Sequence, residues 1–144
     1  MFFKEIKMLN RYNYEEKIIL ASIIEREAKD GLEERRTIAG ILMNRYRQGM
    51  ALQADATVQY DLGDQNNWWP TLTQEDYKLD SPSNTYARPG LPPGPISNPG
   101  IDSLKAAFNP KDTDFLYYIH APDGKVYYAK TLEEHNDNIA RYLH

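Results

Sequence analysis

The sequence predicts a single compact α+β domain that spans residues 1–144. Three features predict this class: N-terminal helical patterns, an irregular centre rich in proline and glycine, and a β-hairpin followed by a C-terminal helix. Helices and strands that occupy separate parts of a chain are typical of α+β proteins. A chain of 144 residues is also long enough to enclose one hydrophobic core.

Two helices are predicted in the first third of the chain. Residues 14–29 place a wide arc of leucine, isoleucine and alanine on a helical wheel, so this helix is expected to be mostly enclosed. Glu25 and Glu27 both fall inside that arc, near its opposite margins. The segment "KDG" at 29–31 interrupts the pattern, and a second amphipathic run extends from about residue 32 to residue 48, where Gly49 follows as a helix stop.

The centre of the chain is expected to be mostly irregular. Residues 50–62 mix strand-like and helix-like signals, which predicts an extended segment that leads into a short helical turn. The polar stretch 63–80 is predicted to be a loop or insertion, in which Thr73 and Asp76 cap a brief helix. Residues 88–100 hold eight proline or glycine residues in thirteen positions, which rules out a helix interior or a central strand.

The last third of the chain carries clearer signals. Asn98–Pro99 is a favourable helix start, and that helix is expected to end near Asn109–Pro110. Residues 114–129 read as a hairpin, with "APDGK" as the turn between two aromatic strands. Thr131 and Glu134 then form a capping box for a final helix.

Composition and charge exclude several classes of function. The net charge is -4 and the isoelectric point is near 5.4, whereas a duplex nucleic-acid binder needs a basic surface, so no nucleic-acid partner is expected. The chain has no cysteine, which excludes disulfides and thiolate catalysis. Its three histidines show no metal-ligand spacing, and no apolar run is long enough to cross a membrane. We therefore expect no metal, no cofactor and no membrane segment in this chain.

The two glutamates of "ASIIEREA" are the first candidates for chemistry. A buried carboxylate is costly unless it is paired or kept protonated. A carboxyl group at the edge of an apolar pocket has a raised pKa and can donate a proton near neutral pH, as cleavage of a glycosidic bond requires. The structural alternative is that each glutamate pairs with an arginine, such as Arg36 or Arg45, and joins two helices.

Four blocks of sequence together resemble one protein family. They are "LASIIEREA" (20–28), "RRTIAGILMNRYRQGMALQADATVQY" (35–60), "SPSNTYARPGLPPGPISNPGIDSLKAAFNP" (81–110) and "LYYIHAPDGKVYYAKTLEEHND" (116–137). In this order they resemble the YceG-like family of endolytic murein transglycosylases from bacteria. The resemblance covers nearly the whole chain.

The resemblance implies a substrate and a set of roles. Such enzymes cut peptidoglycan glycan strands between N-acetylmuramic acid and N-acetylglucosamine, without water, and leave a 1,6-anhydromuramyl end. The catalytic glutamate of the family matches Glu25, which is expected to face a groove as the general acid and then the general base. Glu27 matches a second family carboxylate and is expected to be structural, facing inward to an arginine such as Arg45.

Two other functions stay open at the level of the sequence. Asp55 is a spare carboxylate that could serve a muramidase-type hydrolase, which needs a second carboxylate or a held water. A non-catalytic peptidoglycan-binding module is the third reading. The products of cleavage distinguish the two enzymes, and a Glu25→Gln variant distinguishes an enzyme from a binding module.

The remaining family blocks are expected to line the groove. Amide, hydroxyl and carboxylate groups suit recognition of acetamido and hydroxyl groups on sugars, and the predicted substrate-binding residues are Gln53, Asp55, Asn84, Thr85 and Tyr86. The alternative for Asn84 and Asp55 is that they cap turns.

Three further side chains are weaker candidates for contact with sugars. His135 is expected to contact the groove. Trp68 and Trp69 either stack on sugar rings or belong to a packed insertion, because an indole serves both purposes.

Members of the family usually carry an N-terminal membrane helix and a LysM-like module ahead of this region. The sequence shows neither, which is expected either for the catalytic domain of a longer parent protein that carries the family anchor or for a naturally short relative. The resemblance also implies action at the extracytoplasmic face of the bacterial cell membrane. The implied partners are peptidoglycan glycan strands and the cell-wall synthesis machinery.

Overall fold

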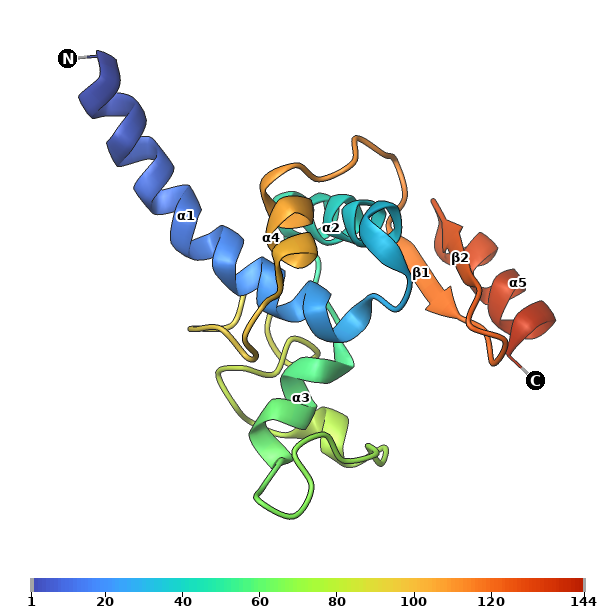
Figure 1. Ribbon diagram of the computed structural model, residues 1–144. Coiled ribbons are helices and arrows are strands. Elements are labelled where there is room, and N and C mark those ends of the chain that lie inside the picture. Colours follow the sequence, from blue (N-terminus) through green and yellow to red (C-terminus); the bar gives the residue numbers. More distant parts are fainter. Residues whose placement is uncertain (1, 144) are drawn as a thin grey trace.

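The computed structural model describes the backbone of residues 2–143 and the side chains of residues 14–143 (Figure 1). The described chain forms α-helices, one short 3-10 helix and a two-stranded sheet, which confirms the predicted α+β class. The elements in order are α1 Phe2–Glu27, α2 Gly31–Gln48, α3 Asp55–Leu62, η1 Asp76–Lys78, α4 Ile101–Phe108, β1 Tyr117–His120, β2 Val126–Ala129 and α5 Leu132–Tyr142.

The core lies where the C-terminal half of α1 meets α2 and α4, while the N-terminal half of α1 projects away from the other elements (Figure 1). Leu20, Ile23 and Ile24 of α1 are buried there against Ile38 and Leu42 of α2. Each such aliphatic side chain contributes about 1.5–3 kcal/mol on burial. The prediction of an enclosed first helix is confirmed, although this helix begins at Phe2 rather than at residue 14.

Helix α2 follows the sequence prediction closely and is crossed by a distant segment. It ends at Gly49, whose φ of 72° is the left-handed conformation that favours glycine. The backbone after α4 passes over the middle of α2, where the N–H of Lys111 donates to the carbonyl of Arg36 at 2.9 Å. A Cβ atom at Gly40 would lie 2.2 Å from the carbonyl oxygen of Lys111, so only glycine permits this crossing.

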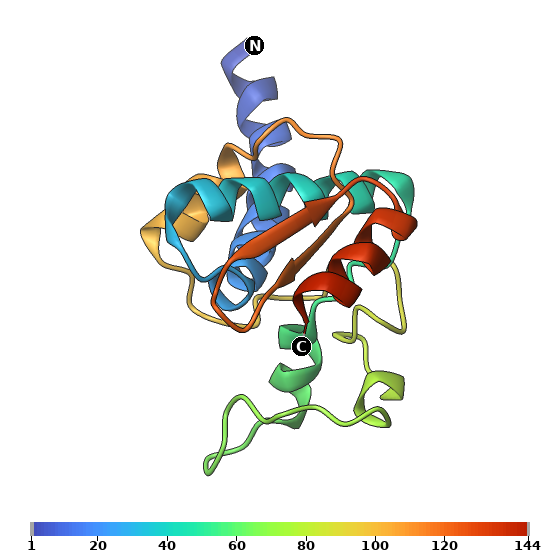
Figure 2. The same ribbon diagram turned by 90° about the vertical axis from the view of Figure 1, so that its right-hand side faces the viewer.

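The predicted hairpin and its following helix are both confirmed. Strands β1 and β2 pair antiparallel, with Tyr117 opposite Ala129, and the sheet lies between α2 and α5 (Figures 1 and 2). The capping box at the start of α5 is present, because the N–H of Glu134 donates to Thr131 Oγ1 at 3.2 Å and the carboxylate of Glu134 accepts the N–H of Lys130 at 2.9 Å.

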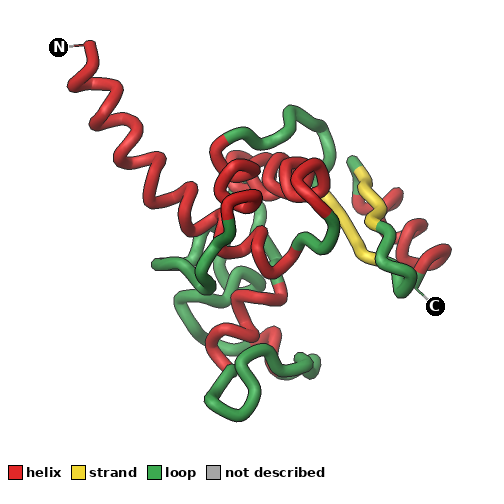
Figure 3. The backbone as a smooth tube through the Cα atoms, in the orientation of Figure 1, coloured by secondary structure: helices red, strands yellow, loops and turns green. Residues whose placement is uncertain are grey.

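The centre of the chain is irregular, as the green segments of Figure 3 show. The short helix near Asp76 is present as η1, and Asp76 Oδ2 accepts the N–H of Thr73 at 2.7 Å. Residues 88–100 contain no helix or strand, as predicted. The predicted cap of α4 is wrong: Asn98 does not cap this helix, which begins two residues later with Gly100 as its N-cap residue.

Candidate functional site

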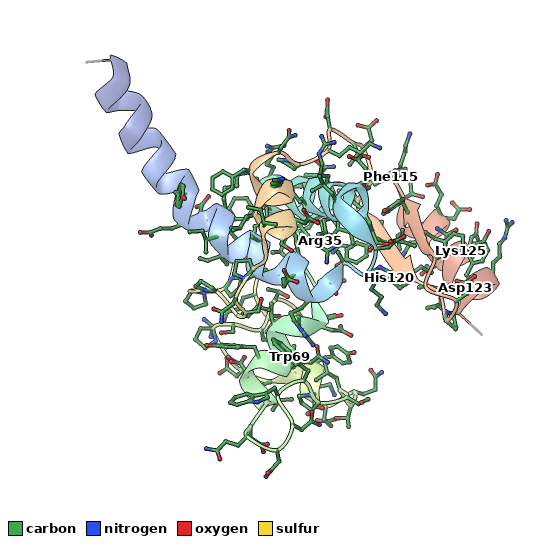
Figure 4. The ribbon with its side chains drawn as sticks, viewed as in Figure 1. Arg35, Trp69, Phe115, His120, Asp123 and Lys125 are labelled. Atoms are coloured by element: carbon green, nitrogen blue, oxygen red, sulfur yellow. The ribbon has the colours of Figure 1, made fainter. Side chains whose placement is uncertain are left out.

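A pocket of about 340 Å³ lies where α1 ends, α3 begins and the hairpin passes. Its walls come from six parts of the chain, and Figure 4 labels one of these residues, His120, on the hairpin side. The polar side chains that line it are Glu27, Arg45, Gln53, Asp55, Tyr86, Tyr118, His120 and His135. The pocket therefore gathers two carboxyl groups, phenols, imidazoles and one guanidinium from distant stretches of sequence.

Glu27 is the last residue of α1 and lies in this pocket. Its pKa is raised to about 7, first because burial penalises the charged carboxylate and second because Asp55 places a negative charge nearby. Hydrogen bonds from the backbone N–H groups of Ala56 and Asp55 and the charge of Lys29 oppose this rise only in part. Glu27 is therefore a carboxyl group that can both hold and release a proton near neutral pH.

Asp55 is the first residue of α3 and has different surroundings. Its Oδ1 accepts a short hydrogen bond from the hydroxyl of Tyr86, and its Oδ2 accepts one from the hydroxyl of Tyr77 at 3.3 Å. Its place at a helix N-terminus also favours negative charge. Both oxygens of Asp55 are thus engaged by phenolic donors.

The two tyrosines in the pocket are held as proton-bearing donors. Burial raises the pKa of Tyr86, and its hydrogen bond to Asp55 raises the pKa further. Burial also raises the pKa of Tyr118, with the charge of Glu27 as the second cause. Neither phenol ionises near neutral pH, so both present O–H groups beside the carboxyl groups.

A buried network under the pocket fixes the start of α3. Asn84 is fully buried, and its side chain donates to the carbonyls of Tyr77 and Leu79 at 3.1 and 2.8 Å and accepts the N–H of Tyr86 at 2.9 Å. Thr85 is also buried, and its hydroxyl accepts the N–H of Ala54 at 2.9 Å. Asn84 and Thr85 thus position Tyr86 and α3 and do not line the pocket, whereas Gln53, Asp55 and Tyr86 do. The predicted substrate contacts of these residues stay a prediction.

Gln53 stands at the rim of the pocket and is solvent exposed. Its φ of 54° is uncommon for a residue with a side chain. The backbone N–H of Gln53 donates to the carbonyl of Thr85 at 3.3 Å, which holds this conformation in place.

Arg45 is buried in the wall of the pocket but does not pair with a glutamate. Its Nε donates to the carbonyl of Leu116 at 2.6 Å and its Nη1 to the carbonyl of Ala51 at 2.8 Å, and the guanidinium lies 4.8 Å from the ring centroid of Tyr117. Burial lowers its pKa. Among the residues that the structure describes, no ion pair joins Glu27 to an arginine, so the predicted Glu27–Arg45 contact is wrong.

Glu25 points to a different part of the molecule. Its Oε1 accepts the N–H of Gly100 at 2.7 Å and the hydroxyl of Ser103 at 3.0 Å, at the N-terminus of α4. A carboxylate at this place satisfies helix N–H groups and complements the helix dipole. The expected orientation of the two glutamates is therefore reversed: Glu27 faces the pocket, and Glu25 caps α4.

Two histidines that face the pocket extend its polar wall. His135 lines the pocket, where its ring stacks on Tyr117 at 4.8 Å and burial lowers its pKa. Its predicted contact with substrate stays a prediction. His120 was not predicted, and its Nε2 lies 3.5 Å from Glu34 Oε2; no local pattern in the sequence places it in the pocket.

Two further findings concern metals and membranes. Within residues 14–143, whose side chains are described, no group of three or more histidine, aspartate or glutamate side chains gathers in a way that could hold a metal ion. None of the described helices combines the length and apolar composition needed to span a bilayer.

Comparison with known proteins places these features in context. A family model described as the YceG-like family matches residues 3–141. An endolytic murein transglycosylase of Bacillus subtilis (strain 168) is 39% identical over 134 residues, which cover 93% of this chain and 36% of that protein. An endolytic murein transglycosylase of Streptococcus pneumoniae (strain ATCC BAA-255 / R6) is 34% identical over 146 residues, which cover 99% of this chain and 26% of that protein.

A solved structure supports the same placement. The crystal structure of the yceG-like protein lmo1499 from Listeria monocytogenes is 40% identical in sequence and superimposes with a TM-score of 0.81. The match covers 94% of this chain and 43% of that chain. This chain therefore spans less than half the length of each of these relatives.

Proposed function

This chain belongs to the YceG-like family, and we propose that it is the catalytic region of an endolytic peptidoglycan lytic transglycosylase. The substrate is the glycan strand of peptidoglycan, and the bond that breaks is the β-1,4 bond between N-acetylmuramic acid and N-acetylglucosamine. The observation that carries the proposal is one carboxyl group, Glu27, whose pKa is raised to about 7 in a polar pocket. Relatives that cover nearly all of this chain are named endolytic murein transglycosylases.

Glu27 rather than Glu25 is proposed as the acid and base. Protonated Glu27 donates its proton to the glycosidic oxygen as the bond from that oxygen to C1 of the muramyl sugar breaks. The C6 hydroxyl oxygen of the same sugar then bonds to C1, and its proton returns to Glu27. The atoms balance without water, and one carboxyl group performs both proton transfers. Glu25 is unsuited to this role because it does not line the pocket and its Oε1 binds the start of α4 instead.

Asp55 supports this chemistry through its charge. The muramyl C1 gains positive charge as the glycosidic bond breaks, and a nearby carboxylate stabilises it. The same negative charge raises the pKa of Glu27 and keeps its proton available. The hydroxyls of Tyr77 and Tyr86 hold both oxygens of Asp55.

The hydrolase alternative is less well supported. An inverting hydrolase uses its second carboxylate to activate water, and a retaining one uses it as a nucleophile. The two tyrosine hydrogen bonds occupy the oxygens that Asp55 would need for either task. When the C6 hydroxyl of the muramyl sugar attacks C1, Asp55 need neither activate water nor act as a nucleophile.

The remaining parts of the proposal concern place and partners. Peptidoglycan lies outside the cytoplasmic membrane, so action at its extracytoplasmic face follows from the proposed substrate. The cell-wall synthesis machinery is the class of partner that such cleavage would serve.

Digestion of purified glycan strands tests the proposal. Wild-type chain should produce 1,6-anhydromuramyl ends detectable by mass spectrometry, and Glu27→Gln should reduce their rate of formation by about 10²–10⁴-fold, the usual contribution of general acid–base catalysis. Glu25→Gln is the matched control and should retain most activity, although it weakens the cap of α4.

Two results would contradict the proposal in different ways. Reducing muramyl ends in place of anhydro ends would indicate a hydrolase. Full activity of Glu27→Gln together with loss in a folded Glu25→Gln would return the catalytic role to Glu25.

A further inference from the structure

We propose that Trp68 forms a second carbohydrate contact, which binds a sugar ring of the same glycan strand beyond the end of α3. This inference rests on the proposed function, because the pocket supplies the first contact. It assigns a binding role to a loop that the catalytic mechanism does not use.

Trp68 is an exposed aromatic residue in an exposed apolar neighbourhood. Its side chain is 64% exposed, and Tyr60 and Leu62 near the end of α3 are also exposed. Tyr60 and Leu62 are two positions apart and face different sides of α3, so Leu62 is the one that lies on the side of the pocket residue Asp55. An indole offers a flat apolar face, which suits the C–H face of a sugar ring.

The loop that carries Trp68 is held in place by hydrogen bonds. Asp64 and Asn67 exchange two backbone hydrogen bonds of 3.0 and 3.2 Å, and Asp64 Oδ1 accepts the N–H groups of Asn66 and Asn67. Gln59 of α3 donates to the carbonyl of Pro70 at 3.0 Å. A residue displayed on a braced loop loses little conformational freedom when a ligand binds.

Trp69 shows the opposite behaviour and anchors this loop. It packs against the hydrophobic core, and the guanidinium of Arg26 lies 3.8 Å from its ring centroid. Figure 4 shows Trp69 close to the end of α1. Because Arg26 precedes Glu27, this contact ties the loop to the helix that carries the proposed acid, while Trp68 stays open to solvent.

Helix α3 joins the pocket to this surface. It begins with Asp55 in the pocket and ends at Leu62, which lies on nearly the same face about 10 Å further along the axis. Figure 2 shows α3 leading away from the hairpin and α5, with the loop beyond its far end. A glycan strand that runs from the pocket along this face would reach Trp68 within a few sugar units.

The local charges favour a neutral glycan over an anionic ligand. Asp61 and Asp64 flank the loop, and the guanidinium of Arg26 is stacked on Trp69. Acidic groups would repel phosphates of a membrane surface or a nucleic acid. They do not oppose the uncharged N-acetylglucosamine rings of the strand.

Tryptophan fluorescence measures this contact directly, since the chain has two tryptophans. In a Trp69→Phe variant, Trp68 is the remaining reporter, and titration with N-acetylglucosamine oligomers of increasing length should shift its emission. Oligomers that reach both sites should bind roughly three- to tenfold more weakly to Trp68→Ala than to wild type, as expected for one aromatic contact. Short oligomers should bind both proteins equally.

Phe108→Ala is the matched control. Phe108 is 46% exposed and ends α4, on the opposite side of the molecule from the loop after α3 (Figure 1). Phe108→Ala should bind long and short oligomers with the same affinities as wild type. Equal affinity of wild type and Trp68→Ala for long oligomers would overturn the inference, as would an equal loss for short and long ones.

These binding measurements need no turnover, so the two proposals fail separately. Oligomer binding through Trp68 without cleavage of glycan strands would reject the proposed function alone. Cleavage that forms anhydro ends with no contribution from Trp68 to binding would reject this inference alone.

Discussion

At the scale of single residues, Glu27 and Asp55 differ because their neighbours differ. Asp55 receives two phenolic hydrogen bonds at the start of α3, which stabilise its negative charge. Glu27 loses water and faces that charge, so its pKa rises to about 7. Two carboxyl groups with such different surroundings can take separate roles in one reaction.

This difference predicts the pH dependence of cleavage. Glu27 must be protonated to act as an acid, so kcat/KM should fall as pH rises above about 7. Asp55→Asn removes the second cause of the raised pKa but leaves burial, so the alkaline limb of the profile should move to lower pH. The measurement is the rate of anhydro-end formation between pH 5 and pH 9.

The position of the limb, rather than the size of the rate, is the informative quantity. Asp55→Asn should also lower the maximal rate, because this residue stabilises charge at C1. A limb that stays at the same pH in Asp55→Asn would show that the charge of Asp55 does not act on Glu27.

The sequence could predict that the two glutamate side chains point in different directions, but not which of them faces the pocket. Positions two apart on a helix point about 160° away from each other, so Glu25 and Glu27 had to reach different surroundings. Which of them meets the pocket depends on where α3 and α4 lie. Gly100 and Ser103, which bind Glu25, are 75 and 78 residues away in the chain, and no local pattern encodes that contact.

At the scale of elements, the prediction succeeded where local chemistry decides. The stop at Gly49 and the capping box of Thr131 and Glu134 depend on neighbours within a few residues, and both are present. It failed at α4, where the side chain that caps the helix comes from α1. It left the role of Asn84 open between a substrate contact and a turn cap, because the burial and three hydrogen bonds of this residue are set by the fold of residues 77–86.

The crossing of α2 by the segment after α4 predicts a stability effect. Gly40→Ala places a Cβ within 2.2 Å of the carbonyl oxygen of Lys111, so one of the two backbones must shift. We expect a loss of about 1–3 kcal/mol, the usual cost of overpacking. Urea denaturation followed by circular dichroism measures it.

Gly94→Ala provides the control for this substitution. A Cβ at Gly94 meets no atom within 4 Å, so the same change there should leave stability unchanged or raise it by a few tenths of a kcal/mol through the unfolded state. Equal stabilities of the two variants would show that α2 and the crossing segment separate easily.

At the scale of the whole molecule, the buried carboxyl group of the site lowers the free energy of unfolding near neutral pH. Distant parts of the chain enclose Glu27, and its burial together with the charge of Asp55 raises its pKa from 4.5 to about 7. In this interval the folded chain holds the proton and the unfolded chain releases it, so the free energy of unfolding falls as pH rises from about 4.5 to about 7. The full shift corresponds to a loss of up to about 3 kcal/mol, which water in the pocket reduces.

Glu27→Gln should therefore stabilise the fold while it lowers activity. Glutamine never ionises, so the variant should have a higher Tm than wild type at pH 8, by several degrees for a stabilisation of about 1–3 kcal/mol. The difference should vanish near pH 4, where Glu27 is neutral in both states. Calorimetry at the two pH values measures this, and Glu25→Gln should instead be less stable than wild type at pH 8, because α4 loses a charged cap. If Glu27→Gln were less stable than wild type at pH 8, its carboxylate would be a stabilising group, and the raised pKa on which its proposed role depends would be wrong.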